Sequence, residues 1–143
     1  MHFVVIDAIP ALLGGTREDP TVPDGALEVL EHIAMRYRLG AIADAGNTIS
    51  GLRRSLETHH LDRYFESIGT SAGFGPEVSA RVLRRMFTTA RIPIHHVVVV
   101  TGRRHVAEQL RRNRFSVILT EGPAGFAGIP TALDAIETGR ITP

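Results

Sequence analysis

The stretch His95-His96-Val97-Val98-Val99-Val100 decides the fold, because its four consecutive valines predict a strand that is buried on both faces. Such runs of β-branched residues are typical of the middle of a parallel sheet, whose two faces are covered by helices. A second apolar run, His2-Phe3-Val4-Val5-Ile6-Asp7, predicts another buried strand and ends on a carboxylate. The two runs together indicate a sheet that lies in the interior of the molecule.

Strand and helix patterns alternate on either side of these runs. Further strands are predicted at 39–43, 66–70 and 115–119, and helices are predicted near 24–37, 49–56, 78–87, 106–110 and 131–136. The Gly- and Pro-rich segment 10–23 predicts a loop or short flap. This alternation predicts a three-layer α/β domain over residues 1–143, with a mostly parallel central sheet of about five strands and a loosely defined tail over 121–143.

Composition excludes several kinds of chemistry. All 16 positive charges are arginine, the chain has no cysteine, and the net charge is +1. The absence of cysteine excludes disulfides, thiol nucleophiles and thiolate metal sites. A near-neutral charge argues against nucleic-acid binding, which depends on the release of many counterions. No apolar run reaches the ~20 residues that span a bilayer, and no basic region precedes the first apolar run, so we expect no membrane contact and a cytoplasmic location.

Polar residues follow the ends of three predicted strands. Asp7, Asp44 and the segment Thr101-Gly102-Arg103 each stand at or just after such an end. In a parallel sheet, ligands bind beyond the carboxyl ends of the strands. The strand pattern alone therefore predicts that these residues gather at one edge of the sheet.

The order of these segments resembles the haloacid dehalogenase (HAD) superfamily, from about Phe3 to about Thr120. The likeness includes Val4-Val5-Ile6-Asp7, Asn47-Thr48-Ile49 and Leu61-Asp62-Arg63-Tyr64-Phe65. It implies a Rossmann-like HAD-type domain. The intervals from Asp7 to Ala43 and from Asp44 to Val78 leave no room for a folded cap domain, so the resemblance is to capless members.

The first two of the four motifs of HAD phosphatases are altered. The first motif is a pair of aspartates two residues apart, a nucleophile and a general acid and base. Asp7 matches the nucleophile, but Ile9 stands at the second position. In the second motif, Ala43 replaces the hydroxyl residue that holds the phosphoryl group, and Asp44 beside it has the wrong charge for a phosphate. The first motif therefore offers no group for protonating a leaving group or activating water.

The last two motifs are altered as well. Gly75-Pro76-Glu77-Val78-Ser79 occupies the place of a lysine motif, and Arg81 is the nearest cation because the chain has no lysine. In the fourth motif Gly102 replaces the first acid, and His105 stands where the later acid would be. Magnesium prefers several hard oxygen ligands, so we expect no cofactor and no Mg²⁺ site.

Two carboxylates have a structural interpretation beside the functional one. Asp7 is either a surviving ligand-binding group or a remnant that caps backbone amides or pairs with Arg103, and we favour the remnant. Asp44 is either a cation ligand or a turn and N-cap residue, and we favour the cap. The adjacent histidines at 59–60 and 95–96 diverge from each other and do not predict a metal site.

We therefore predict a catalytically inactive HAD-like protein that acts by association, with another protein subunit or with a second copy of itself. One alternative is a hydrolase or phosphatase with an atypical site that uses Asp7, with Asp44 or His105 as proton-transfer group. Another is a sensor of small anions or phosphometabolites. The predicted ligand-binding residues are Asp7, Asp44, Asn47, Thr101, Arg103 and Arg104.

Overall fold

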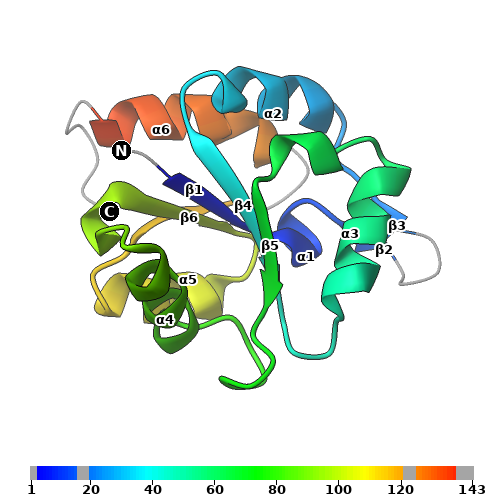
Figure 1. The fold of residues 1–143 in the computed structure, drawn as a ribbon. Helices are drawn as coiled ribbons and strands as arrows, with labels where there is room; N and C mark the ends of the chain where they lie inside the picture. Colours follow the sequence, from blue (N-terminus) through cyan, green and yellow to red (C-terminus); the bar gives the residue numbers. More distant parts are fainter. Residues whose placement is uncertain (1–2, 16–19, 121–124, 138–143) are drawn as a thin grey trace.

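A five-stranded parallel sheet runs through the middle of the molecule (Figure 1). The computed structural model describes residues 3–15, 20–120 and 125–137. Along the sheet the strands follow the order β5 (Ser67–Thr70), β4 (Arg38–Ala43), β1 (Phe3–Asp7), β6 (Val97–Thr101) and β7 (Ser116–Leu119). The predicted sheet is therefore confirmed, with the strand that ends at Asp7 in its centre.

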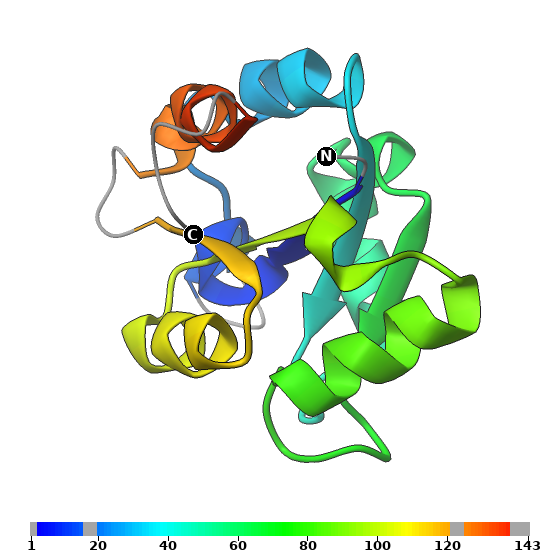
Figure 2. The same ribbon diagram turned by 90° about the vertical axis from the view of Figure 1, so that its left-hand side faces the viewer.

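Helices cover both faces of this sheet, as Figures 1 and 2 show. One face carries α2 (Ala26–Ala34), α3 (Ile49–Thr58) and α6 (Ile129–Glu137), and the other carries α4 (Ala80–Ala90) and α5 (Arg104–Arg112). The three-layer arrangement is confirmed. Of the tail over 121–143, residues 125–137 form η3 (Phe126–Gly128) and α6, and the remainder lies outside the described residues.

The four valines of β6 explain why the sheet has two cores. Val98 and Val100 pack in the cluster with α2, α3 and α6, whereas Val97 and Val99 pack in the cluster with α4 and α5. All four have no exposed surface. Since successive side chains of a strand point to opposite faces, a strand covered on both sides needs apolar residues at every position.

Short elements fill the connections. After β1 come α1 (Ala8–Ala11) and the antiparallel pair β2 (Gly14–Gly15) and β3 (Pro20–Thr21), which form the predicted flap. After β4 come α3, η1 (Asp62–Tyr64) and β5, and η2 (Ile94–His96) precedes β6. Within the described segments, the connection from β1 to β4 contains no cap domain, and the connection from β4 to α4 contains none either.

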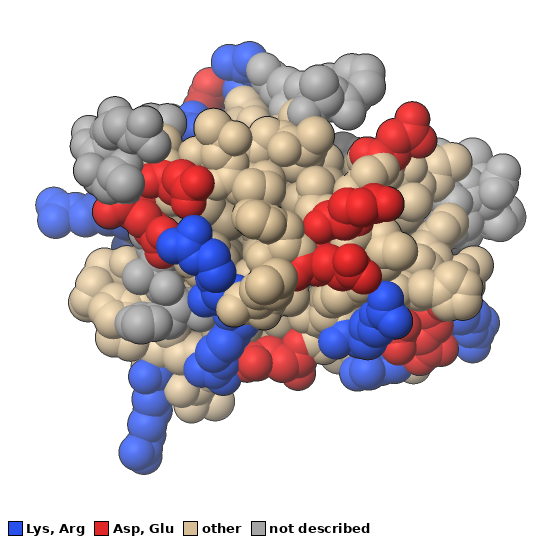
Figure 3. Space-filling view, turned by 90° about the horizontal axis from the view of Figure 1, so that it is seen from above, with Lys and Arg blue, Asp and Glu red and all other residues tan. Residues whose placement is uncertain are grey.

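The outer surface of α2 and α6 mixes acidic and basic side chains rather than presenting one sign of charge (Figure 3). Arg36, which follows α2, pairs with Asp134 at 3.2 Å and with Glu137 at 2.9 Å on α6. These exposed pairs join the two helices but contribute little stability each. Among the described residues, none of the helices combines the length and apolar character that a bilayer-spanning helix requires.

Gly40 is a point of close approach between strands, and its replacement tests the packing. A Cβ atom there would lie 2.8 Å from Ser67 Oγ and 2.9 Å from the Phe3 ring. That ring packs edge-on against Phe87, with centroids 5.3 Å apart, so a shift of the ring would disturb this contact. We expect Gly40→Ala to lower the free energy of unfolding by about 1–3 kcal/mol, measured by urea denaturation.

The matched control is Gly128→Ala, because a Cβ at Gly128 meets nothing within 4 Å. This variant should unfold within about 0.5 kcal/mol of the wild type. Equal stability of the two variants would show that β4 and β5 are not packed as closely as described.

Candidate functional site

Four of the predicted site residues come together at the carboxyl edge of the sheet. Asp7 is the last residue of β1 and Thr101 is the last residue of β6, while Asp44 directly follows β4. Arg103 immediately precedes α5, and its carbonyl oxygen accepts a hydrogen bond from Ala107 N at 3.0 Å. Because β4, β1 and β6 are neighbours in the parallel sheet, their ends meet at one place.

The guanidinium of Arg103 joins the two aspartates. Its Nε and Nη2 donate to Asp7 Oδ2 at 3.1 and 2.8 Å. Its Nη1 donates to Asp44 Oδ2 at 2.6 Å, and Nη2 also donates to Asp44 Oδ1 at 3.0 Å. The planar fork of an arginine suits this kind of bidentate contact with a carboxylate.

The Asp7 carboxyl is buried, and only one of its oxygens is hydrogen-bonded. Its side chain is 1% exposed. Thr101 Oγ1 donates to Oδ2 at 2.8 Å, whereas the buried Oδ1 has no partner among the described residues. Burial raises the pKa of Asp7 above its ordinary value of 3.8, even though Arg103 and Thr101 act in the opposite direction. Asp7 therefore pairs with Arg103, which is the structural interpretation favoured from the sequence.

Asp44 occupies a more polar environment. Besides Arg103, its Oδ1 accepts a hydrogen bond from the backbone N of Val78 at 2.9 Å. Burial acts to raise the pKa of Asp44, but the hydrogen bonds from Arg103 and Val78 together outweigh it, so the pKa lies below its ordinary value of 3.8. The two carboxyls that share one guanidinium thus have pKa values displaced in opposite directions.

The favoured interpretation of Asp44 as an N-cap is wrong for the helix that follows it. The cap of α3 is Thr48, whose Oγ1 accepts a hydrogen bond from Gly51 N at 2.9 Å. Asp44 instead begins a turn that Asn47 N closes on the Asp44 carbonyl at 3.0 Å. The helix begins one turn later than the cap interpretation requires, which leaves the Asp44 carboxylate free to reach across to Arg103 and Val78.

A third carboxylate, Glu77, lies at the rim of the cluster. Its Oε2 is 3.7 Å from Arg103 Nη1 and 2.7 Å from His105 Nε2. Glu77 and His105 have side chains that are 50% and 67% exposed, so this pair is solvated. The sequence placed Glu77 only in the altered lysine motif. Its proximity depends on how the loop before α4 folds over the sheet edge, which no local pattern encodes.

Asn47 and Arg104 lie beside the cluster rather than in it. Arg104 is the first residue of α5 and is exposed. The Asn47 side chain donates to the Asp44 carbonyl at 3.4 Å. The structure therefore brings together four of the six predicted ligand-binding residues, and it places His105 against Glu77 rather than against Asp7.

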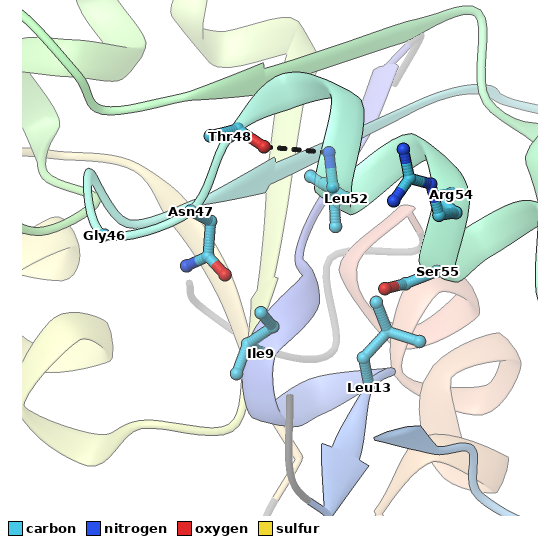
Figure 4. A pocket seen from close by; sticks show the side chains of 9 residues that line it. Ile9, Leu13, Gly46, Asn47, Thr48, Leu52, Arg54 and Ser55 are labelled. Atoms are coloured by element: carbon cyan, nitrogen blue, oxygen red, sulfur yellow. Dashed lines mark hydrogen bonds between the residues drawn. The ribbon is translucent and has the colours of Figure 1, made fainter. Parts of the chain in front are cut away.

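A cavity of about 290 Å³ opens next to the cluster, between α1 and the start of α3 (Figure 4). Ile9 and Leu13 line it from one side, and α3 lines it from the other (Figure 4). The remaining lining residues are Gly46, Asn47, Thr48, Gly51, Leu52, Arg54 and Ser55. Ile9 is the position at which the family resemblance expects an acid, and none of the described residues that line the cavity carries a carboxylate.

Known structures share this fold at low sequence identity. A haloacid dehalogenase-like hydrolase from Xanthomonas campestris aligns with a TM-score of 0.69 and 18% identity over 85% of this chain and 58% of that chain. A haloacid dehalogenase-like protein of unknown function from Agrobacterium tumefaciens aligns with a TM-score of 0.67 and 15% identity over 85% and 64%. A putative HAD-hydrolase from Bacillus subtilis, bound to magnesium, aligns with a TM-score of 0.60 and 12% identity over 70% and 44%.

These likenesses establish the HAD-like fold. No family model and no curated protein matches the sequence. The chain spans 58%, 64% and 44% of the lengths of the three proteins just named. Over residues 3–15, 20–120 and 125–137 the fold is that of the HAD core, and no cap is inserted in these segments.

The magnesium that this fold implies does not fit the residues present. The two aspartates at the carboxyl edge are contacted by guanidinium nitrogens at 2.6–3.1 Å, so the position between them is filled by Arg103. Ile9 and Gly102 provide no oxygen ligand from their side chains. Among the described residues, no three His, Cys, Asp or Glu side chains are grouped so as to hold a metal ion.

The opposite pKa displacements of Asp7 and Asp44 predict opposite effects of pH on stability. Asp7 has a raised folded pKa, so its contribution is fully present below its unfolded pKa and is lost as pH rises through the folded value. Asp44 has a lowered folded pKa, so its contribution is present above its unfolded pKa and is lost as pH falls through the folded value.

We expect the wild type to gain stability relative to Asp7→Asn as pH falls toward 3.8, and to lose stability relative to Asp44→Asn as pH falls below 3.8. Near neutral pH, Asp44→Asn should also cost about 2 kcal/mol through weakened charged hydrogen bonds. Urea denaturation between about pH 3 and pH 6 measures both differences. Parallel pH profiles for the two variants would contradict the assignment.

Proposed function

We propose that this chain is a catalytically inactive protein with the HAD-like fold, and that it acts by binding another protein. The observation that carries the proposal is the state of Asp7, the residue that matches the family nucleophile. Its carboxyl is buried, and its one hydrogen-bonded oxygen is held by Arg103 and Thr101. A nucleophile must reach the substrate, but Oδ2 is committed to an ion pair and the unpartnered Oδ1 is buried.

The partner groups that phosphoryl transfer requires are also missing. Ile9 and Ala43 replace the acid/base and the hydroxyl, and the chain contains no lysine. His105, the alternative proton-transfer group, contacts Glu77 at 2.7 Å on the exposed rim. General acid–base catalysis requires the group to lie within hydrogen-bond reach of the reacting atoms. These contacts support the inactive protein over the atypical hydrolase.

The alternative of an anion sensor has less support. Arg103 directs its nitrogens at Asp7 and Asp44 and lies 3.7 Å from Glu77. Three carboxylates thus surround one guanidinium, so the cluster has an excess of negative charge and would repel an incoming anion. Arg104 is exposed at the start of α5, where a phosphate contact would be screened by solvent.

An apolar groove at the opposite end of the sheet is the candidate binding surface. It has a volume of about 390 Å³ and is lined by Phe3, Arg38, Glu66, Ser67, Phe74, Arg85, Met86, Phe87, Thr89, Ala90 and Ile92. Phe3, Arg38 and Ser67 are the first residues of β1, β4 and β5, whereas Asp7 is the last residue of β1. Aromatic, Met and Arg side chains are enriched in protein interfaces.

The charges on this groove indicate the chemistry of its partner. Arg38 is neutralised by Glu66 at 2.6 Å and lies over the Phe3 ring. Arg85 lies over the Phe74 ring, 5.9 Å from its centroid, and has no carboxylate partner among the described residues. We therefore propose a protein partner that presents an apolar side chain next to a carboxylate, with self-association as an outcome that the binding test can reveal.

The absence of turnover is tested by hydrolysis of p-nitrophenyl phosphate and a panel of phosphorylated metabolites, with and without Mg²⁺. We expect the wild type to be no faster than Asp7→Asn, because the Asp7 carboxylate is committed to Arg103. Ile9→Asp should be inactive as well, since restoring one acid supplies neither the lysine nor the hydroxyl. Turnover that Asp7→Asn abolishes would identify an enzyme and end the proposal.

Binding is tested by capture from extracts of the cells that express the chain, followed by titration of the purified partner. We expect Arg85→Glu to weaken the affinity by about tenfold or more through charge reversal, and Asp7→Asn to leave it unchanged. Arg84→Glu is the matched control, because Arg84 is a neighbouring exposed arginine on α4 whose Nη2 donates to the Asn113 carbonyl at 3.0 Å, outside the groove.

Sedimentation of the purified chain distinguishes a second copy from another protein. A mass that doubles with concentration in the wild type and not in Arg85→Glu would identify self-association through the groove. A partner lost equally from Arg85→Glu and Arg84→Glu, or lost from Asp7→Asn, would contradict binding at this surface.

A further inference from the structure

Three carboxylates surround one cation at the carboxyl edge of the sheet, and one of them, Asp7, is buried. Asp7, Asp44 and Glu77 all lie within 4 Å of the Arg103 guanidinium, at 2.8, 2.6 and 3.7 Å. The Asp7 side chain is 1% exposed, so bulk water cannot solvate its charge. A buried charge is stable only when it is paired and hydrogen-bonded. The guanidinium is therefore essential to this arrangement of charges.

Both the main chain and the side chain of Arg103 are held by hydrogen bonds. Arg103 N donates to Thr101 Oγ1 at 3.2 Å, and Thr101 Oγ1 donates in turn to Asp7 Oδ2 at 2.8 Å. The guanidinium then returns to the same Asp7 oxygen, which closes a ring of three residues from β1, β6 and the start of α5. The Arg103 side chain is 17% exposed. Arg103 is thus held at its main-chain nitrogen and at its guanidinium, and its side chain is largely excluded from solvent.

We infer that Arg103 is a built-in cation, which performs at this edge the neutralising role that a divalent metal ion performs in a site of carboxylates. The inference follows from the misfit of magnesium and does not depend on the proposed function. Its consequence is specific. Folding of the wild type is independent of divalent ions, and removal of the guanidinium exposes a latent divalent-cation site made by Asp7 and Asp44, whose remaining ligands would be water.

The donors for such a site exist once Arg103 is removed. Asp7 Oδ2 and Asp44 Oδ1 both lie within 3.0 Å of the same nitrogen, Arg103 Nη2, so one ion in its place would have an oxygen on either side. The unpartnered Asp7 Oδ1 is a further buried oxygen. Mg²⁺ often keeps several waters and uses one or two carboxylates, and Ca²⁺ accepts irregular oxygen geometry.

The test compares thermal unfolding of the wild type and Arg103→Ala in millimolar MgCl₂ or CaCl₂ with unfolding in NaCl of matched ionic strength. The wild type should show no shift between these salts. Arg103→Ala should have a lower Tm, because its removal leaves Asp7 buried without a counter-charge. One of the divalent ions should raise that Tm saturably by about 3 °C or more. The double variant Arg103→Ala/Asp44→Asn should lose this response.

If Arg103→Ala does not fold, two other Arg103 variants and a calorimetric titration of the wild type test the same role. Arg103→Gln preserves most of the side-chain volume without the charge and should show the same divalent response, whereas Arg103→Lys retains a cation and should show none. Calorimetric titration of the wild type with Ca²⁺ and Mg²⁺ should give no saturable binding. Saturable binding to the wild type that Asp7→Asn removes would overturn the inference, as would folded Ala and Gln variants without a divalent response.

The outcome is separable from that of the proposed function. Phosphatase turnover that requires Asp7 but no divalent ion would end the proposed function and leave the role of Arg103 intact. A divalent ion bound by the wild type would overturn the role of Arg103 without bearing on the partner that the groove binds.

Discussion

The ion pair between Arg103 and Asp7 is the interaction on which the carboxyl edge of this protein depends. Asp7 ends the central strand and has no exposed surface, so its charge is shielded from water. An unpaired carboxylate in that position would cost several kcal/mol. The chain contains no lysine, and the fork of donors of Arg103 contacts two carboxylates at once, although its single positive charge balances only one of them.

The core residues of this fold are retained in this chain, whereas several positions that match the family's chemical motifs carry other residues. The residues that build the two cores are buried throughout, including every valine of β6, whereas the positions that phosphoryl transfer needs carry Ile9, Ala43 and Gly102. Core substitutions cost several kcal/mol, and polar residues in a buried strand are poorly tolerated. A sequence that drifts without selection would lose both. Retention of the core supports our proposal that the folded chain binds a partner.

The sequence predicted those features of the fold that depend on local or periodic patterns of residues. Four consecutive valines require cover on both faces, and together with the alternation of strand and helix patterns they predict a parallel sheet with helices on each side. The positions of Asp7, Asp44 and Thr101 at strand ends then follow from topology. Contacts that depend on side-chain reach were not predictable in the same way. The cap of α3 at Thr48 and the approach of Glu77 to Arg103 depend on where a turn ends and how a loop folds, and neither leaves a periodic signal.

The site and the groove occupy opposite ends of the same strands, and this separation has a mechanical consequence. β1 has five residues, so Asp7 and Phe3 lie roughly 13 Å apart along one strand. Arg103 fixes the carboxyl end of the sheet by joining β1, β4 and the start of α5, while Gly40 lets Phe3 and Ser67 approach closely at the amino end. The closed charge cluster thus acts as a structural anchor at one end, and the groove at the other end is a preformed surface. A preformed surface loses less entropy on binding, so the groove that we propose as a binding surface would need little reordering to take a partner.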